Sequence, residues 1–99
     1  MRKSKKVFIR SVIPQVELSK LPPEVQTTIN LISVGGSYPH SKDGIVFKNL
    51  EGLLPPQPQG YYREYTVPTP GATDRGSRRL ITGQNDEIYY TDNHYNSFQ

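Results

Sequence analysis

Between residues 22 and 33 the apolar side chains follow helical spacing. Val25, Ile29 and Ile32 recur at intervals of four and three, with Leu31 beside them. Two prolines at the start suit the first turn of a helix, the early glutamate suits the positive end of the helix dipole, and a Gly-Gly pair follows the stretch. The pattern predicts one helix over residues 22–33, with an apolar stripe that a sheet can cover.

Downstream of the glycine pair, short β-type runs alternate with turn residues such as Lys-Asp-Gly, Pro-Thr-Pro-Gly and Gly-Gln-Asn-Asp. The regular spacing indicates an antiparallel meander. A helix followed by such a sheet predicts one α+β domain, in which a single N-terminal helix packs on one face of a small antiparallel sheet and the other face is open. The expected strands are residues 45–47, 61–67, 78–82 and 88–91, with a short piece near 95–98.

The run GYYREYTV at residues 60–67 carries a carboxylate in the middle of an expected strand. A period of two sends Tyr61, Arg63, Tyr65 and Val67 to one face, and Tyr62, Glu64 and Thr66 to the other. Glu64 is therefore either an ordinary solvent-facing residue or a placed acid.

Composition narrows the classes of site that the domain can hold. A chain of 99 residues buries one core and is too short to divide into two domains. It has no cysteine, which excludes disulfides, thiolate catalysis and cysteine-based metal sites. The two histidines, His40 and His94, are not spaced as metal ligands, so we expect no metal and no other cofactor. We also expect no membrane-spanning segment.

Charge is distributed unevenly along the chain. The net charge is +3, but five of the twelve basic residues lie at positions 2–10, which leaves seven basic and nine acidic residues from position 11 onward. We assign residues 1–16 to a basic leader and residues 17–99 to the folded domain. The leader is a poor signal peptide, because its apolar stretch is short and no small-residue cleavage site follows. It is either a flexible leader or a basic arm that attracts RNA without reading its sequence.

Arginines cluster within the expected domain and indicate a local anion site. Four lie within seventeen residues that contain only two acids. The four are Arg63, Arg75, Arg78 and Arg79.

Three side chains of different strands can converge, because neighbouring strands lie roughly 5 Å apart. They are Glu64, Arg79 and His94. A base, an acid and guanidinium groups are what RNA cleavage through its own 2′-hydroxyl requires, and the tethered nucleophile makes a metal unnecessary. Each residue also has an ordinary interpretation: Glu64 in a cross-strand ion pair, His94 on the surface, and one arginine of the Arg78-Arg79 pair in solvent. From the residues alone, both interpretations stay open.

Four stretches of the chain carry a resemblance to a known family: LPPEVQTTINLI, YPHSKDGIVFKNLEGLLP, GYYREYTVPTPGATDRGSRRLITG and YYTDNHY. They resemble the microbial guanyl-specific ribonucleases, in the prokaryotic branch that includes barnase, and especially the small streptomycete enzymes. The resemblance runs from about Leu18 to Phe98, nearly without gaps. It implies the microbial ribonuclease fold and cleavage of single-stranded RNA after guanosine. The implied products are a 2′,3′-cyclic phosphate and then, by hydrolysis, a 3′-phosphate.

The resemblance also implies roles for individual residues. Glu64 stands at the position of the general base, and His94 at that of the general acid. Arg75 and Arg79 stand where the family binds the scissile phosphate, and Tyr95 would line the phosphate and base region.

Guanine recognition maps, by the same resemblance, to one loop. Glu51 would accept hydrogen bonds from N1–H and the exocyclic amino group of guanine, and backbone N–H groups from Lys48 to Leu50 would meet O6. Phe47 would stack on the base, and Asn49 would also form a turn. Lys48 and Leu50 replace polar or arginine residues of the streptomycete enzymes, which puts base affinity in question more than guanine preference.

The implied partners are single-stranded RNA and an acidic inhibitor protein of the barstar type, whose carboxylates would enter the phosphate site. We expect a monomer, secreted as the family resemblance implies. Two alternatives remain: an inactive RNA-binding module of the same fold, or the same nuclease domain as the toxic tip of a secreted antibacterial protein.

Overall fold

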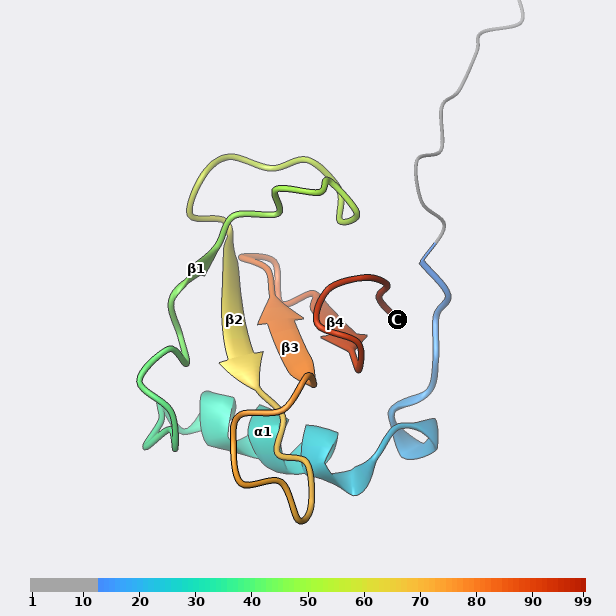
Figure 1. Cartoon of the computed structure of the whole chain (residues 1–99). Helices are drawn as coiled ribbons and strands as arrows, with labels where there is room; N and C mark the ends of the chain where they lie inside the picture. Colours follow the sequence, from blue (N-terminus) through green and yellow to red (C-terminus); the bar gives the residue numbers. More distant parts are fainter. Residues whose placement is uncertain (1–12) are drawn as a thin grey trace, which may run out of the picture.

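The computed structural model describes residues 13–99, which form a 3-10 helix η1 (Leu18–Lys20), one α-helix α1 (Pro23–Ser33) and four strands. The strands pair antiparallel in the order β1-β2-β3-β4, and α1 lies across them near one end of the sheet (Figure 1). The α+β class, the helix and four of the five expected strands are confirmed. The strands are β1 (Val46–Phe47), β2 (Tyr62–Thr66), β3 (Arg79–Thr82) and β4 (Ile88–Thr91).

The fifth expected strand, near residues 95–98, is wrong. The chain turns there, because His94 and Tyr95 have φ angles of +57° and +75°, which an extended strand does not allow. After the turn, the backbone of Gln99 exchanges two hydrogen bonds of 2.8 Å with the backbone of Tyr90. The C-terminal segment thus lies beside β4 without forming a strand.

The apolar stripe of α1 packs against one face of the sheet, as its spacing predicts. Val25 is completely buried in this contact, which removes the stripe from water and stabilises both layers. The buried members of this core are Val25, Tyr65, Val67, Leu80 and Tyr90, with Ile29 and Ile32 partly buried against them.

Both ends of α1 are tied down. At the C-terminal end, the N–H of Gly36 donates to the carbonyl of Leu31 at 3.0 Å, and Gly35 takes a φ of +84°, which glycine adopts without steric cost. At the N-terminal end, Arg78 donates to Glu24 in the first helical turn at 3.3 Å. Arg78 therefore links the start of β3 to the helix.

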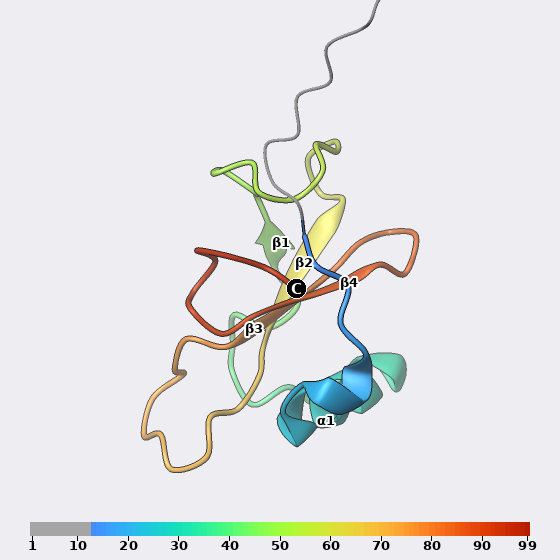
Figure 2. The same cartoon turned by 90° about the vertical axis from the view of Figure 1, so that its right-hand side faces the viewer.

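The other face of the sheet is covered, so the expected open face is wrong. Tyr62, Ile81 and Tyr89 project from this face, and their large apolar surface favours cover by further chain. The loop after β1 and the C-terminal segment supply that cover; Figure 2 shows the C-terminal segment and α1 on opposite sides of β3 and β4. The resulting aromatic cluster contains Leu54, Tyr61, Tyr62, Ile81 and Phe98, with Ile13, Phe47, Leu53, Tyr89 and Tyr95 partly buried against it.

The alternation expected in GYYREYTV is confirmed inside β2 and fails just before it. Tyr65 packs towards α1, whereas Tyr62 and Glu64 lie on the covered face. Tyr61 precedes the strand and packs against Tyr62, with 4.9 Å between ring centroids, so it does not join Tyr65. Arg63 is exposed and makes a hydrogen bond to a backbone carbonyl, away from Glu64.

Most of the expected leader, residues 1–12, lies outside the described residues. Ile13 packs partly buried against the aromatic cluster, and the chain reaches η1 without regular structure. The division at residue 16 stays a prediction. Within residues 13–99, no helix has the length and apolar character needed to cross a bilayer.

We expect Leu80→Ala to lower the free energy of unfolding by about 2 to 5 kcal/mol, because it empties a completely buried site between α1 and the sheet. Urea denaturation measures this change. Leu50→Ala is the matched control, since Leu50 is 84% exposed and its truncation should leave the free energy nearly unchanged. Equal losses in the two variants would contradict these burial assignments.

Candidate active site

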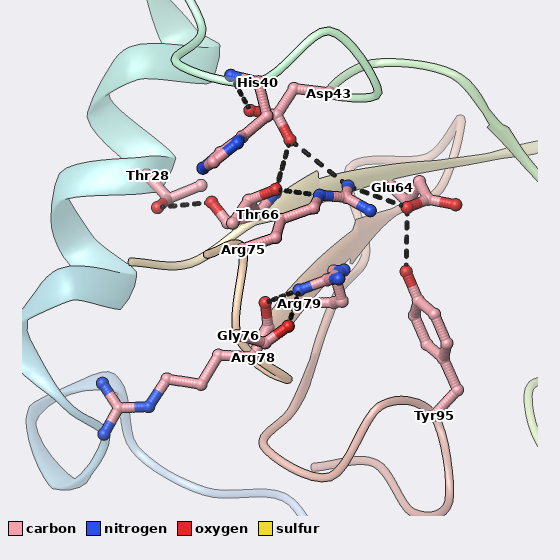
Figure 3. A network of polar contacts seen from close by, with 10 residues as sticks. All are labelled: Thr28, His40, Asp43, Glu64, Thr66, Arg75, Gly76, Arg78, Arg79 and Tyr95. Carbon is pink, nitrogen blue, oxygen red and sulfur yellow. Dashed lines mark hydrogen bonds and ion pairs between the residues drawn. The ribbon is translucent and has the colours of Figure 1, made fainter. Parts of the chain in front are cut away.

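Glu64 lies in the middle of β2 on the covered face, with 14% of its side chain exposed. Its backbone is fixed by the segment before β1: Gly44 N–H donates to the Glu64 carbonyl at 2.7 Å, and Glu64 N–H donates to Ile45 at 3.0 Å. Figure 3 shows two donors on Oε1, namely Nη2 of Arg75 at 3.1 Å and the hydroxyl of Tyr95 at 2.9 Å. No hydrogen bond within residues 13–99 occupies Oε2, which is open to a further donor.

Arg75 reaches Glu64 from the loop between β2 and β3. Its Nε donates to Oγ1 of Thr66 at 2.6 Å, and its Nη2 lies 3.5 Å from Oδ1 of Asp43 (Figure 3). The Asp43 side chain is 1% exposed and accepts from both the N–H and the hydroxyl of Thr66 at 2.7 Å. The guanidinium of Arg75 is thus held between two carboxylates and a hydroxyl.

Arg79 is a buried cation beside Arg75, and it is 3% exposed. Its Nη1 donates to the carbonyls of Gly76 at 3.0 Å and Arg78 at 2.8 Å, while its Nε has no hydrogen-bond partner in the described part of the chain. None of the ion pairs within residues 13–99 involves Arg79. Burial, and next the charge of Arg75, lower the pKa of Arg79 from its ordinary value. Such a pair of cations favours a bound anion.

His94 and Tyr95 occupy the turn that follows β4. Oγ1 of Thr91 accepts from the N–H of Tyr95 at 3.2 Å, and Oδ1 of Asn93 accepts from the next two N–H groups at 3.2 and 3.1 Å. The N–H of His94 donates to the carbonyl of Ser77 at 3.0 Å. The His94 residue is exposed, and its ring centroid lies 4.9 Å from that of Tyr95. The turn therefore places the imidazole at the surface, against the tyrosine ring.

Tyr95 donates a hydrogen bond from its hydroxyl to Glu64 in a partly buried environment. Burial, and next the charge of Glu64, raise the pKa of Tyr95 above its ordinary value. The phenol therefore keeps its proton at neutral pH and remains a hydrogen-bond donor to the carboxylate.

The loop after β1 is held in a tight turn by Asn49, as expected. Asn49 has a φ of +56°, and its side-chain amide both donates to the carbonyl of Leu54 at 3.0 Å and accepts from its N–H at 3.2 Å. The two hydrogen bonds close the loop of residues 49–54 and constrain its backbone.

The expected guanine-binding residues lie around this loop, but they do not all face one space. Phe47, Lys48 and Asn49 help to line a hollow of about 210 Å³. Leu50 and Glu51 are exposed and do not line it. The ring of Phe47 lies against that of Tyr95, 4.8 Å between centroids, and so joins the loop to the carboxylate site.

The structure thus brings four of the expected site residues into one contact network, and sets the others beside it. Glu64, Arg75, Arg79 and Tyr95 form the network, His94 and Phe47 contact it through Tyr95, and the remaining loop residues lie beyond Phe47. A carboxylate and an imidazole beside two guanidinium groups can move protons on a bound phosphate ester.

Four residues of the site were missed by sequence reasoning. Asp43 was assigned only to a Lys-Asp-Gly turn, and Thr66 only to a strand face; their contact joins residues 23 apart in the sequence. Thr91 and Asn93 hold the turn after β4. Short polar side chains of this kind are typical of turns, so the sequence TDN at residues 91–93 could have predicted that these two residues stabilise it. No group of three or more metal-ligating side chains occurs within residues 13–99.

Comparisons with known proteins find relatives in sequence and in structure. A family model described as ribonuclease matches residues 4–99. Guanyl-specific ribonuclease Sa of Kitasatospora aureofaciens is 57% identical over 82 residues, which cover 82% of this chain and 85% of that protein. Guanyl-specific ribonuclease St of Saccharopolyspora erythraea is 53% identical over 85 residues, which cover 86% of this chain and 84% of that protein. A crystal structure of ribonuclease Sa2 with guanosine-2′-cyclophosphate aligns with a TM-score of 0.78 at 49% identity, covering 82% of this chain and 86% of that one.

We expect alkaline pH to weaken the fold in part through Tyr95. Its pKa is raised in the folded chain above the ordinary value of 10.0, so its contribution is complete below about pH 10. Above that pH the unfolded chain releases the proton first, and stability falls as pH rises. Urea denaturation between about pH 9 and pH 11 should show a shallower decline for Tyr95→Phe than for the wild type. If the free energy of unfolding fell equally with pH in both proteins, the raised pKa of Tyr95 would be contradicted.

Proposed function

The chain belongs to the ribonuclease family, and from that premise we propose that it is a guanyl-specific endoribonuclease that cleaves single-stranded RNA after guanosine. The observation that carries the proposal is Arg79, buried beside Arg75 without an ion-pair partner among the described residues. A phosphodiester bound between these cations would lie next to Glu64 and would give Arg79 the negatively charged partner that it lacks among residues 13–99. We propose that the two arginines bind the nonbridging oxygens of the scissile phosphate.

The first proposed step is transesterification. Oε2 of Glu64 accepts the proton of the 2′-hydroxyl, and the 2′-oxygen forms a bond to phosphorus. The bond from phosphorus to the 5′-oxygen of the next nucleotide breaks, and His94 gives that oxygen a proton. Arg75 and Arg79 stabilise the negative charge that grows on the nonbridging oxygens. The nucleophile is part of the substrate, so the residues named here are sufficient without a metal.

The second proposed step is hydrolysis of the 2′,3′-cyclic phosphate, with the two proton-transfer roles exchanged. His94 accepts a proton from water as its oxygen attacks phosphorus, and Glu64 returns a proton to the departing 2′-oxygen. The product is a 3′-phosphate. The hydrogen bond from Tyr95 keeps Oε1 of Glu64 in one place while Oε2 exchanges protons.

Guanine recognition is proposed at the loop after β1. Glu51 is exposed, so its carboxylate is free to accept from N1–H and the exocyclic amino group. Phe47 provides an aromatic wall at the hollow, and the Asn49 turn constrains the loop beside it, where the backbone N–H groups of residues 48–50 would meet O6. Because Phe47 also contacts Tyr95, a base held here lies next to the phosphate site.

Several wider expectations stay predictions. They are the acidic barstar-type inhibitor, the monomeric state and secretion, and the toxic tip of a secreted antibacterial protein stays an alternative.

We expect Glu64→Gln and His94→Gln each to lower kcat by at least about a hundredfold, because each removes a group that moves a proton. Initial rates on a guanosine-containing RNA measure this loss. The matched control for the first variant is Glu17→Gln, which makes the same change outside the proposed site. A His94→Gln rate close to that of the wild type would show that another group is the acid.

A second experiment maps the product ends of a defined single-stranded RNA digested in EDTA. We expect 2′,3′-cyclic phosphate ends after guanosine, converted later to 3′-phosphates. Glu51→Gln should lower the preference for cleavage after guanosine. The free energy of unfolding should stay nearly unchanged, since Glu51 is exposed. Intact RNA would leave only a binding module, and equal cleavage after all four bases in the wild type would exclude guanine recognition by Glu51.

A further inference from the structure

Asp43 is a buried carboxylate that the proposed reaction does not use. Its side chain is 1% exposed, and burying such a charge costs free energy unless hydrogen bonds and a counter-charge offset it. Its surroundings meet this requirement through Thr66, which donates twice, through the N–H of His40 at 3.3 Å, and through Arg75 at 3.5 Å. These contacts point the carboxylate at the guanidinium of Arg75.

The hydroxyl of Thr66 links Asp43 to Arg75, because it donates to the first and accepts from the second. This hydroxyl has one proton, which it donates to Oδ1 of Asp43 at 2.7 Å, so only its lone pairs face Nε of Arg75, at 2.6 Å. Because the N–H of Thr66 donates to the same oxygen of Asp43, the hydroxyl cannot easily turn away. The Asp43 charge thus makes the hydroxyl a better acceptor for Arg75.

Asp43 and Thr66 lie in backbone that is tied to the sheet by hydrogen bonds, whereas Arg75 lies in the loop between β2 and β3. Asp43 precedes Gly44, whose N–H pairs with the carbonyl of Glu64, and Thr66 lies two residues after Glu64 in β2. Arg75 instead reaches in from a loop. Ordering a long side chain on binding costs conformational entropy, and contacts made in advance avoid that cost.

We propose that Asp43, acting through Thr66, is a positioning residue that holds Arg75 in the orientation that binds the scissile phosphate. The inference rests on the proposed function, because it takes Arg75 to be a phosphate ligand. Nη2 of Arg75 lies 3.1 Å from Glu64 and 3.5 Å from Asp43, so one guanidinium is shared between two carboxylates and does not neutralise the base alone.

The test compares two ligands that differ by one phosphate, guanosine and guanosine 3′-monophosphate, by calorimetric titration. Asp43→Asn and Thr66→Val should each weaken binding of the nucleotide by about tenfold, the effect of one hydrogen bond to a charged group, and leave guanosine binding unchanged. Thr66→Ser keeps the hydroxyl and should bind both ligands as the wild type does. The same variants should show a matching loss in kcat/KM.

Arg75→Ala provides the second arm of the test. If the relay acts through Arg75, adding Thr66→Val to Arg75→Ala should cause no further loss of nucleotide affinity. Equal weakening of guanosine and nucleotide, or full additivity with Arg75→Ala, would overturn the positioning role. If Asp43→Asn fails to fold, the Thr66→Val and Thr66→Ser pair decides the question, because both keep the carboxylate. A wild type that binds both ligands equally would instead contradict the proposed phosphate site.

Discussion

The guanidinium groups of Arg75 and Arg79 lie close together on one face of the sheet, where their positive charges repel each other. The polar contacts around them have to offset this repulsion. The chain compensates Arg75 with Asp43 and Glu64, but gives Nη1 of Arg79 only backbone carbonyls. The pairing of β2 with β3 sets Thr66 opposite Arg79, so the residue that accepts from Arg75 also adjoins the second cation. Within residues 13–99 both carboxylates contact Arg75, and Arg79 is left as a buried cation without an ion pair, which favours binding of a phosphate.

The two faces of the sheet differ in role: the face against α1 is part of the hydrophobic core, and the opposite face also carries the candidate active site. The face against α1 is filled by apolar side chains and by tyrosine rings. On the opposite face an aromatic cluster excludes water beside the polar network, and its members also connect the parts of the site: Phe98 lies 6.2 Å from Phe47, and Phe47 lies 4.8 Å from Tyr95. A change in the cluster would thus move the base loop and the carboxylate site together.

Sequence patterns predicted the elements well, because helical spacing and turn residues are local properties. They assigned Glu64 to its face of β2, and the family resemblance singled out the side chains that meet around it. The same patterns left Asp43 in a turn, since its burial depends on Thr66 and Arg75, which lie far along the chain. They also left one sheet face open, because period two says which side chains share a face and says nothing of the segments that cover it.

The turn after β4 places the side chains of His94 and Tyr95 next to each other, which a strand could not do. Neighbouring residues of a strand point to opposite faces, whereas the left-handed φ angles of His94 and Tyr95 let their rings lie 4.9 Å apart. Such angles cost about 1 kcal/mol or more each outside glycine, and they persist only where surrounding contacts hold them. Here Thr91 and Asn93 provide those contacts. The proposed acid and the donor that orients the proposed base therefore depend on one turn, and a change at Thr91 or Asn93 would disturb both functions at once.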